Sequence, residues 1–139
     1  MTNTVERRWC KMISFDTFVQ EDGVPIYLQI ILFLKRGMVA GTIRAGDELP
    51  SRRLLSARLG VNPNTVQKAY HMLEGEGLII SQTGAKSYVS LDPEALTAIR
   101  EELLESEIRS VISALDQMGL RKEEALMLIE KYWPRGEKI

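Results

Sequence analysis

Residues 49–70 constrain the fold of this 139-residue chain more than any other segment, because they hold two short helix patterns separated by Gly60. In the second pattern, four apolar side chains recur at i, i+3, i+4 and i+7, which is the spacing of a buried helix face. They are Val66, Ala69, Tyr70 and Leu73. The segment therefore predicts two helices joined by a tight turn, the second of them packed against a core.

The opposite face of the second helix carries a different set of side chains at the same spacing. All four can form hydrogen bonds and none is acidic: Asn64, Gln67, Lys68 and His71. A short helix with amide and cationic side chains, held by a helix packed across it, is what reading of a DNA major groove requires. The alternative, contact with another protein, would require an exposed apolar face on this helix.

Helix start and stop signals place the first three helices. Pro25 opens a helix that ends near Gly41, because proline tolerates the first helical turn and glycine ends helices. Ser51 and Asn62 are the expected N-caps of the next two helices, and Pro63 follows at a first helical position. The helix after Ser51 is expected to turn three leucines toward the core: Leu54, Leu55 and Leu59.

A β-hairpin is expected after these helices, because β-prone runs at 78–81 and 87–90 flank a turn that contains glycine. Helices followed by such a hairpin form a winged helix-turn-helix, and the wing tip carries Thr83, Gly84, Ala85 and Lys86. We expect residues 43–49 to form a connector. Apolar and polar residues partly alternate over residues 13–19, which favours a short strand or an extended arm.

Two amphipathic helices are expected in the tail, over about 93–119 and 121–133. A tail of about 40 residues cannot bury its apolar faces alone, so it must pack on the winged helix or on a second chain. We favour a second chain, because DNA readers of this type gain affinity and half-site geometry by dimerising. The predicted dimerisation residues are Leu96, Ile99, Leu103, Ile108, Val111, Ile112, Leu115, Leu126, Ile129 and Trp133.

The predicted fold is α+β and mostly helical, a winged helix-turn-helix followed by a two-helix C-terminal dimerisation tail. We assign residues 1–20 to an N-terminal leader or arm, 21–90 to the DNA-binding domain and 91–139 to the tail, where an effector could also be sensed. Residues 25–90 carry 8 basic and 4 acidic side chains, whereas residues 91–139 carry 7 and 11. The basic part suits contact with phosphate and the acidic part does not.

Composition argues against several classes of protein. Cys10 and His71 are the single cysteine and histidine, so we expect no internal disulfide and no zinc site of cysteine and histidine ligands. We also expect no other metal site and no cofactor. No apolar run approaches the roughly 18–20 residues of a membrane span, and the start does not resemble a signal peptide, so we expect a cytoplasmic protein. We find no nucleophile–base pair, phosphate loop or paired carboxylates, and therefore expect no enzymatic activity.

Several motifs within residues 24–90 resemble, in order, the N-terminal domain of the GntR family of bacterial transcription regulators. They are PIYLQI (25–30), GDELPSRRL (46–54), LGVNPNTVQKAY (59–70) and LEGEGLI (73–79). The Pro-Ile-Tyr opening and the short tail resemble the YtrA subfamily, whose members often control ATP-binding-cassette transporters. Some relatives carry an aminotransferase-like domain that binds pyridoxal phosphate, and residues 91–139 are too few for that domain.

The resemblance implies roles for individual residues. Arg53 matches an arginine that holds DNA, and Gly84 matches the wing glycine that approaches the minor groove. Two departures matter: Pro63 stands where many relatives have a base-reading arginine, and Lys86 replaces the second wing glycine, so that the wing can grip phosphate through a charge. The predicted DNA-binding residues are Ser51, Arg52, Arg53, Asn62, Asn64, Thr65, Gln67, Lys68, His71, Thr83, Gly84 and Lys86.

Several side chains have two interpretations. Arg52 either contacts DNA or remains a solvated helix charge, and Arg58 is expected to be solvated or paired within the chain. Tyr70 is expected to pack in the core with its hydroxyl bonded at the edge. Trp133 is expected to anchor a core or an interface rather than to stack on a ligand.

We therefore predict a sequence-specific transcription regulator, a repressor, that binds an inverted-repeat operator in double-stranded DNA as a homodimer. The alternative is a winged-helix module for protein–protein interaction without DNA binding. The tail is too small for an independent pocket, so a small-molecule effector would bind between the tail and the winged helix or at the dimer interface.

Overall fold

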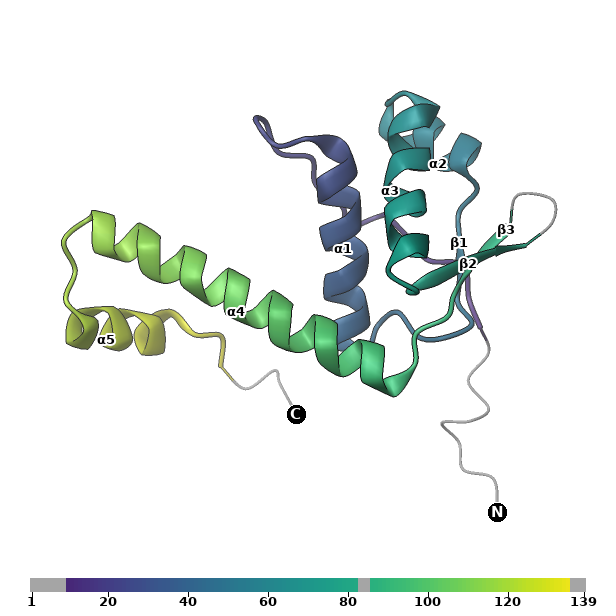
Figure 1. The fold of residues 1–139 in the computed structure, drawn as a ribbon. Coiled ribbons are helices and arrows are strands. Elements are labelled where there is room, and N and C mark those ends of the chain that lie inside the picture. Colours follow the sequence, from purple (N-terminus) through teal and green to yellow (C-terminus); the bar gives the residue numbers. More distant parts are fainter. Residues whose placement is uncertain (1–9, 83–85, 136–139) are drawn as a thin grey trace, which may run out of the picture. The chain divides into compact units, whose positions relative to one another are not determined.

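Five helices and a small sheet make up the parts of the chain that the structure, a computed structural model, describes: residues 10–82 and 86–135 (Figure 1). The helices are α1 (Ile26–Ala40), α2 (Arg52–Leu59), α3 (Pro63–Gly75), α4 (Pro93–Gln117) and α5 (Lys122–Tyr132). The strands are β1 (Glu48–Leu49), β2 (Ile79–Gln82) and β3 (Lys86–Val89). The predicted mixed, mostly helical fold with a winged helix-turn-helix is confirmed.

Local capping explains where α2 and α3 begin. The Ser51 side chain accepts a hydrogen bond from the Leu54 amide (3.1 Å), and the Asn62 side chain accepts one from the Asn64 amide (2.8 Å). Each bond satisfies an amide that the first turn of a helix leaves without a partner. Gly60 follows α2 with φ of 70°, a left-handed conformation that glycine adopts without strain and that turns the chain toward α3.

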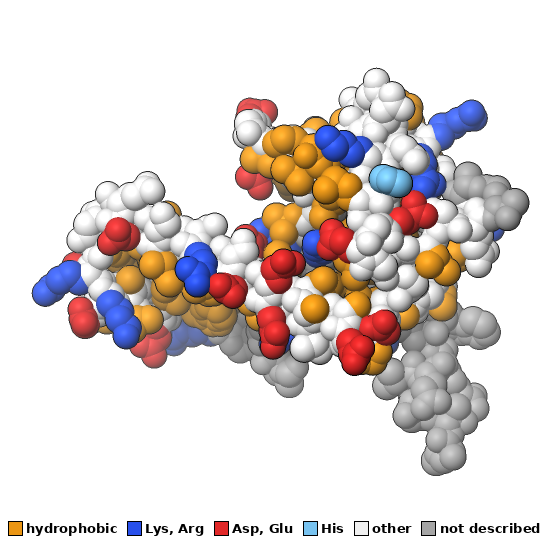
Figure 2. All heavy atoms as spheres, in the orientation of Figure 1, with side chains coloured by type: hydrophobic (Ala, Val, Ile, Leu, Met, Phe, Trp, Pro, Cys, Tyr) orange, Lys and Arg blue, Asp and Glu red, His pale blue; other side chains and the backbone are white. Residues whose placement is uncertain are grey.

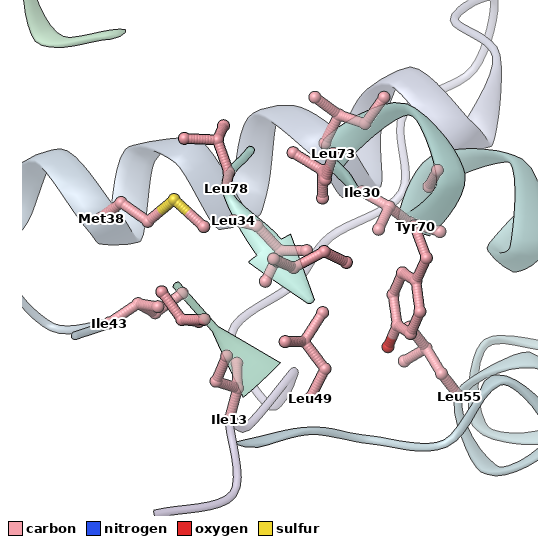
Figure 3. Close-up of a cluster of buried hydrophobic side chains, with 14 of the residues drawn as sticks. Ile13, Ile30, Leu34, Met38, Ile43, Leu49, Leu55, Tyr70, Leu73 and Leu78 are labelled. Carbon is pink, nitrogen blue, oxygen red and sulfur yellow. The ribbon is translucent and has the colours of Figure 1, made fainter. Parts of the chain in front are cut away.

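The core of the first unit forms where α1 and α3 pack together above the sheet (Figure 3). The four apolar residues of the predicted α3 stripe are all 0% exposed. They meet Ile30 and Leu34 of α1 and Leu78, which leads into β2. Each fully buried leucine or isoleucine stabilises the fold by roughly 1.5–3 kcal/mol. Helix α3 is therefore held by one complete face.

One leucine of α2 does not face this core. Leu55 is buried and Leu59 is half-buried, whereas Leu54 is 58% exposed. The buried positions of α2 are Leu55 and Ser56, and Leu54 points about 100° away from Leu55 on the side opposite to Ser56, toward solvent. The prediction that Leu54 faces the core was wrong.

The sheet contains a strand that the sequence pattern did not predict. Its antiparallel order is β1-β3-β2, with Leu49 opposite Ser87 and Gln82 opposite Lys86. The first strand lies inside residues 43–49, which we expected to be only a connector. Two residues are too few to show the alternation by which a strand is recognised.

The described part of the N-terminal segment belongs to the same core. No strand forms within residues 13–19, because the chain turns directly after Phe15. The Ile13 amide donates to the Glu48 carbonyl (2.8 Å), Ile13 and Phe15 are buried, and the Phe15 ring lies 4.8 Å from the Phe33 ring. Residues that we assigned to a leader or arm thus contribute to the winged helix.

Asp47 joins three segments of the first unit although its side chain is fully buried. Its carboxylate accepts hydrogen bonds from the amides of Lys11 (3.3 Å) and Arg44 (2.9 Å), and its carbonyl accepts one from the Val89 amide (2.9 Å). Bonds to a charged acceptor are among the stronger hydrogen bonds in proteins. The N-terminal segment, the connector and β3 therefore meet at one residue.

The chain divides into two compact units, the first ending at Arg100 and the second beginning at Glu101. The first eight residues of α4 thus belong to the winged-helix unit, and two predicted dimerisation residues lie there. Ile99 is buried in its core, and Leu96 packs against that core. The sequence could not show this division, because the apolar stripe continues along α4 without a break.

The second unit has exposed apolar faces on both of its helices. No residue of α5 is buried, and hydrophobic side chains gather on the surface of α4 and α5 (Figure 2). Between the two helices lies an open groove of about 470 Å³ whose lining is mostly apolar. The exposed large hydrophobic residues include Leu104, Ile108, Val111, Ile112, Leu126, Ile129 and Trp133.

Replacing the buried carboxylate tests its role in the fold. We expect Asp47→Ala to lower the free energy of unfolding by about 2–4 kcal/mol, because two amides lose a charged acceptor inside the protein. Urea denaturation followed by circular dichroism measures this loss. Asp22→Ala, at an exposed position, is the control and should change stability by less than about 0.5 kcal/mol. Equal stability of the two variants would contradict the role given to Asp47.

Candidate nucleic-acid interface

The outward face of α3 is entirely polar at the predicted positions. Asn64, Gln67, Lys68 and His71 are all exposed, and Thr65 beside them is half-buried. They stand opposite the apolar stripe that fixes the helix to the core. The structure thus places amide and cationic side chains together on a helix whose rotation about its own axis is set by packing.

Two arginines at the start of α2 have different surroundings. Arg53 is exposed. Arg52 is half-buried: its guanidinium donates to the Ser81 hydroxyl (3.3 Å) and lies 5.1 Å from the centre of the Tyr70 ring. The structure therefore gives Arg52 partners inside the protein, which neither of the interpretations from the sequence included.

Ser51 and Asn62 are the N-caps described above, so their side-chain oxygens accept backbone amides within the protein. Both side chains are nevertheless exposed. Their first role is to fix the ends of α2 and α3. Contact with DNA would be additional to this role.

Lys68 has an aromatic neighbour that the sequence analysis did not find. Its ammonium lies 4.0 Å from the centre of the Tyr27 ring, at the start of α1. An exposed cation–π contact of this kind is worth only about 0.5–1 kcal/mol. This contact therefore places Lys68 against the start of α1 without burying its charge.

Arg58 forms an ion pair with Asp16, which confirms one of its two expected states. The Ser14 hydroxyl and then the Arg58 guanidinium lower the pKa of Asp16 by hydrogen bonding to its carboxylate. Both members of the pair are exposed, so the pair contributes little to stability. Arg58 is accordingly left out of the candidate interface.

Tyr70 connects α3 to the chain before α2. Its hydroxyl donates to the Pro50 carbonyl (2.7 Å), and Figure 3 shows its ring beside Leu55 of α2. Burial raises the pKa of Tyr70, an effect that the nearby Arg52 charge partly offsets. The hydroxyl therefore stays neutral and keeps its proton for this bond. The expectation of a core tyrosine with a bonded hydroxyl is confirmed.

The structure describes the two strands of the wing, β2 and β3. Lys86 is exposed at the start of β3, opposite Gln82. The predicted tip residues Thr83 and Gly84 lie outside the described residues. Within residues 10–82 and 86–135, no group of acidic, histidine or cysteine side chains could hold a metal ion. In that same part of the chain, no helix is both long enough and apolar enough to cross a membrane.

Comparisons with known proteins agree with this geometry. Residues 26–89 match the family described as "Bacterial regulatory proteins, gntR family". The chain is 30% identical over 116 residues to the uncharacterized HTH-type transcriptional regulator YhcF of Bacillus subtilis, covering 84% of this chain and 96% of that protein. It is 41% identical over 98 residues to the HTH-type transcriptional repressor YtrA of the same organism, covering 66% and 73%.

Solved structures show the same fold. A GntR family transcriptional regulator from Listeria monocytogenes is similar with a TM-score of 0.70 and 32% identity, over 81% of this chain and 98% of that one. YtrA from Sulfolobus acidocaldarius, a GntR-family transcription factor, is similar with a TM-score of 0.52 and 32% identity, over 72% and 99%.

Removing the Tyr70 hydroxyl tests how firmly α3 is tied to the chain before α2. We expect Tyr70→Phe to lower the free energy of unfolding by about 1–2 kcal/mol, because the buried Pro50 carbonyl loses its donor while the ring stays in place. Urea denaturation measures the change. The matched control is Tyr132→Phe, at a side chain that is 73% exposed, which should leave stability unchanged. An unchanged midpoint for Tyr70→Phe would contradict the role given to this bond.

Proposed function

This chain belongs to the GntR family of DNA-binding transcription regulators, and we propose that it is a repressor that binds an inverted-repeat operator as a homodimer. The observation that carries the proposal is the two-faced helix α3. Its apolar stripe is completely buried, and its outward positions carry amides and cations without a carboxylate. The repressor role is supported by the similarity to the repressor YtrA of Bacillus subtilis.

We assign reading of bases to the amides of the outward face. Asn64 and Gln67 can each donate to and accept from the major-groove edge of adenine. Arg53, Lys68 and Lys86 suit phosphate, because a cation gains affinity from phosphate whatever the base sequence. His71 stands later on the helix and is assigned to the edge of the contact. Pro63 starts the helix with no donor for guanine.

The alternative, a module that only contacts proteins, has less support. It requires an apolar outward face on α3. Met72 is the one exposed large hydrophobic residue of this helix, whose residues are all described. A single exposed methionine is ordinary on a protein surface. The polarity of α3 therefore favours DNA.

The homodimer is assigned to the second unit. Large contiguous apolar patches are uncommon on monomeric proteins and usually mark an interface. The exposed apolar residues of α4 and α5, among them Ile112, Leu126 and Trp133, form such a surface. The groove between the helices has the size of a ligand pocket. We assign it to the partner chain, because its apolar lining continues that surface.

Selection from a pool of random-sequence duplexes tests the operator. We expect the retained DNA to contain an inverted repeat with half-sites about one helical turn apart. On this DNA, Gln67→Ala should lose discrimination at a single base position, by about 1–3 kcal/mol. Arg53→Ala should weaken binding to all sequences alike and lower the slope of log affinity against log salt by about 0.9. Equal losses on every base variant for Gln67→Ala would remove its role in readout.

Sedimentation tests the dimer. We expect Ile112→Glu to convert the protein to a monomer, because a charge at an apolar interface is left without a partner. Ile112 is 58% exposed within the chain, so its replacement should leave the fold intact. Val19→Glu, at a residue that is 76% exposed in the first unit, is the control and should remain dimeric. Persistence of the dimer in Ile112→Glu would place the interface elsewhere.

A further inference from the structure

We propose that Arg52 is a positioning residue, which holds the wing in place against α3, the recognition helix, and supports DNA binding without touching DNA. The proposal rests on the DNA binding of the family, and it does not depend on the inverted repeat or the dimer. It replaces the DNA contact that the sequence suggested for Arg52.

The first set of contacts ties Arg52 to both strands of the wing. Its two terminal nitrogens donate to the hydroxyls of Ser81 on β2 (3.3 Å) and Ser87 on β3 (3.5 Å). The two hydroxyls are 3.1 Å apart and share a third hydrogen bond. Ser81 and Ser87 are also directly opposite each other in the sheet. One guanidinium therefore spans the hairpin at a single register position.

The second set of contacts ties Arg52 to α3. The guanidinium carbon lies 5.1 Å from the centre of the Tyr70 ring, and a terminal nitrogen lies 4.0 Å from a carboxylate oxygen of Glu74. A planar guanidinium can stack on a ring while its edge donates hydrogen bonds, which a lysine cannot do. Arg52 is thus the point where α2, α3 and the hairpin meet.

The position of this junction in the hairpin matters for the wing. The register pair next to Ser81 and Ser87 is Gln82 and Lys86, where the described hairpin ends. The short strand β1 covers β3 at only two register positions, one of which is Leu49 opposite Ser87. The Arg52 clamp, meaning its contacts with Ser81, Ser87, Tyr70 and Glu74, is therefore one register pair away from Lys86, which the proposed function assigns to phosphate.

Burial separates this arginine from its neighbour. The Arg52 side chain is 21% exposed, and its Nε is buried without a hydrogen-bond partner. A buried donor without a partner costs free energy, so the inward position must be maintained by the other contacts. Arg53, one residue later on α2, is exposed, and the proposed function assigns it to phosphate.

Hydrogen exchange on the free protein tests the clamp without DNA. In Arg52→Lys, Arg52→Ala and Ser87→Ala we expect faster exchange of the amides of β2 and β3, because the hairpin loses its link to α2 and α3. Amides in the middle of α1 serve as the internal reference and should not change. Unchanged exchange in the hairpin of all three variants would overturn the proposal.

Titration of a labelled random-sequence duplex over a range of salt concentrations tests the effect on binding. We expect Arg52→Lys and Ser87→Ala to bind about three- to tenfold more weakly than the original protein, although the first keeps the charge and the second removes only an internal hydroxyl. The combined variant Arg52→Ala/Ser87→Ala should be no weaker than Arg52→Ala alone, because both changes break the same clamp.

A direct phosphate contact gives a different pattern and would overturn the proposal. Arg52→Lys would then bind almost normally, Ser87→Ala would have no effect, and Arg52→Ala would lower the salt slope by about 0.9. All comparisons use the same random-sequence duplex, so the absence of an inverted repeat in the selected DNA would remove the proposed operator and leave this test intact.

Discussion

The buried hydrogen bond from the Tyr70 hydroxyl to the Pro50 carbonyl ties α3 to the chain before α2, and the arrangement of the winged helix depends on this link. It joins the middle of the recognition helix to the residue just before the cap of α2, in a place that water does not reach. The same ring lies under the Arg52 guanidinium. The Tyr70 side chain thus links α3 to α2 and, through Arg52, to the wing. The outward amides of α3 therefore face a fixed direction.

The two faces of α3 explain why fold and function could be inferred together. One spacing of residues fixes the buried stripe, and the same spacing, rotated about the helix, presents the polar stripe. The core thus determines which side chains can reach a groove. Arg52 is the exception, because it starts α2 as a basic residue but serves the packing of the wing.

Local signals predicted the helices and the hairpin, because caps, prolines and glycines act within a few residues. What the sequence did not show depends on residues far apart in the chain. The Asp47 carboxylate binds an amide 36 residues earlier, and Arg52 meets Ser87 35 residues later. Such pairs leave no periodic pattern. Leu54 was placed wrongly for a related reason: an apolar residue on a short helix does not reveal which side of the helix the core covers.

Buried residues near both ends of the first unit limit where this protein can be cut into fragments. Ile13 and Phe15 come from before the segment that matches the family, and Ile99 comes from after it. A fragment cut at residues 26–89 would therefore expose Phe33 and lose the chain that lies along β1. The smallest piece that keeps its interior closed extends beyond the conventional domain limits on both sides, and fusions or truncations should leave residues 10–100 whole.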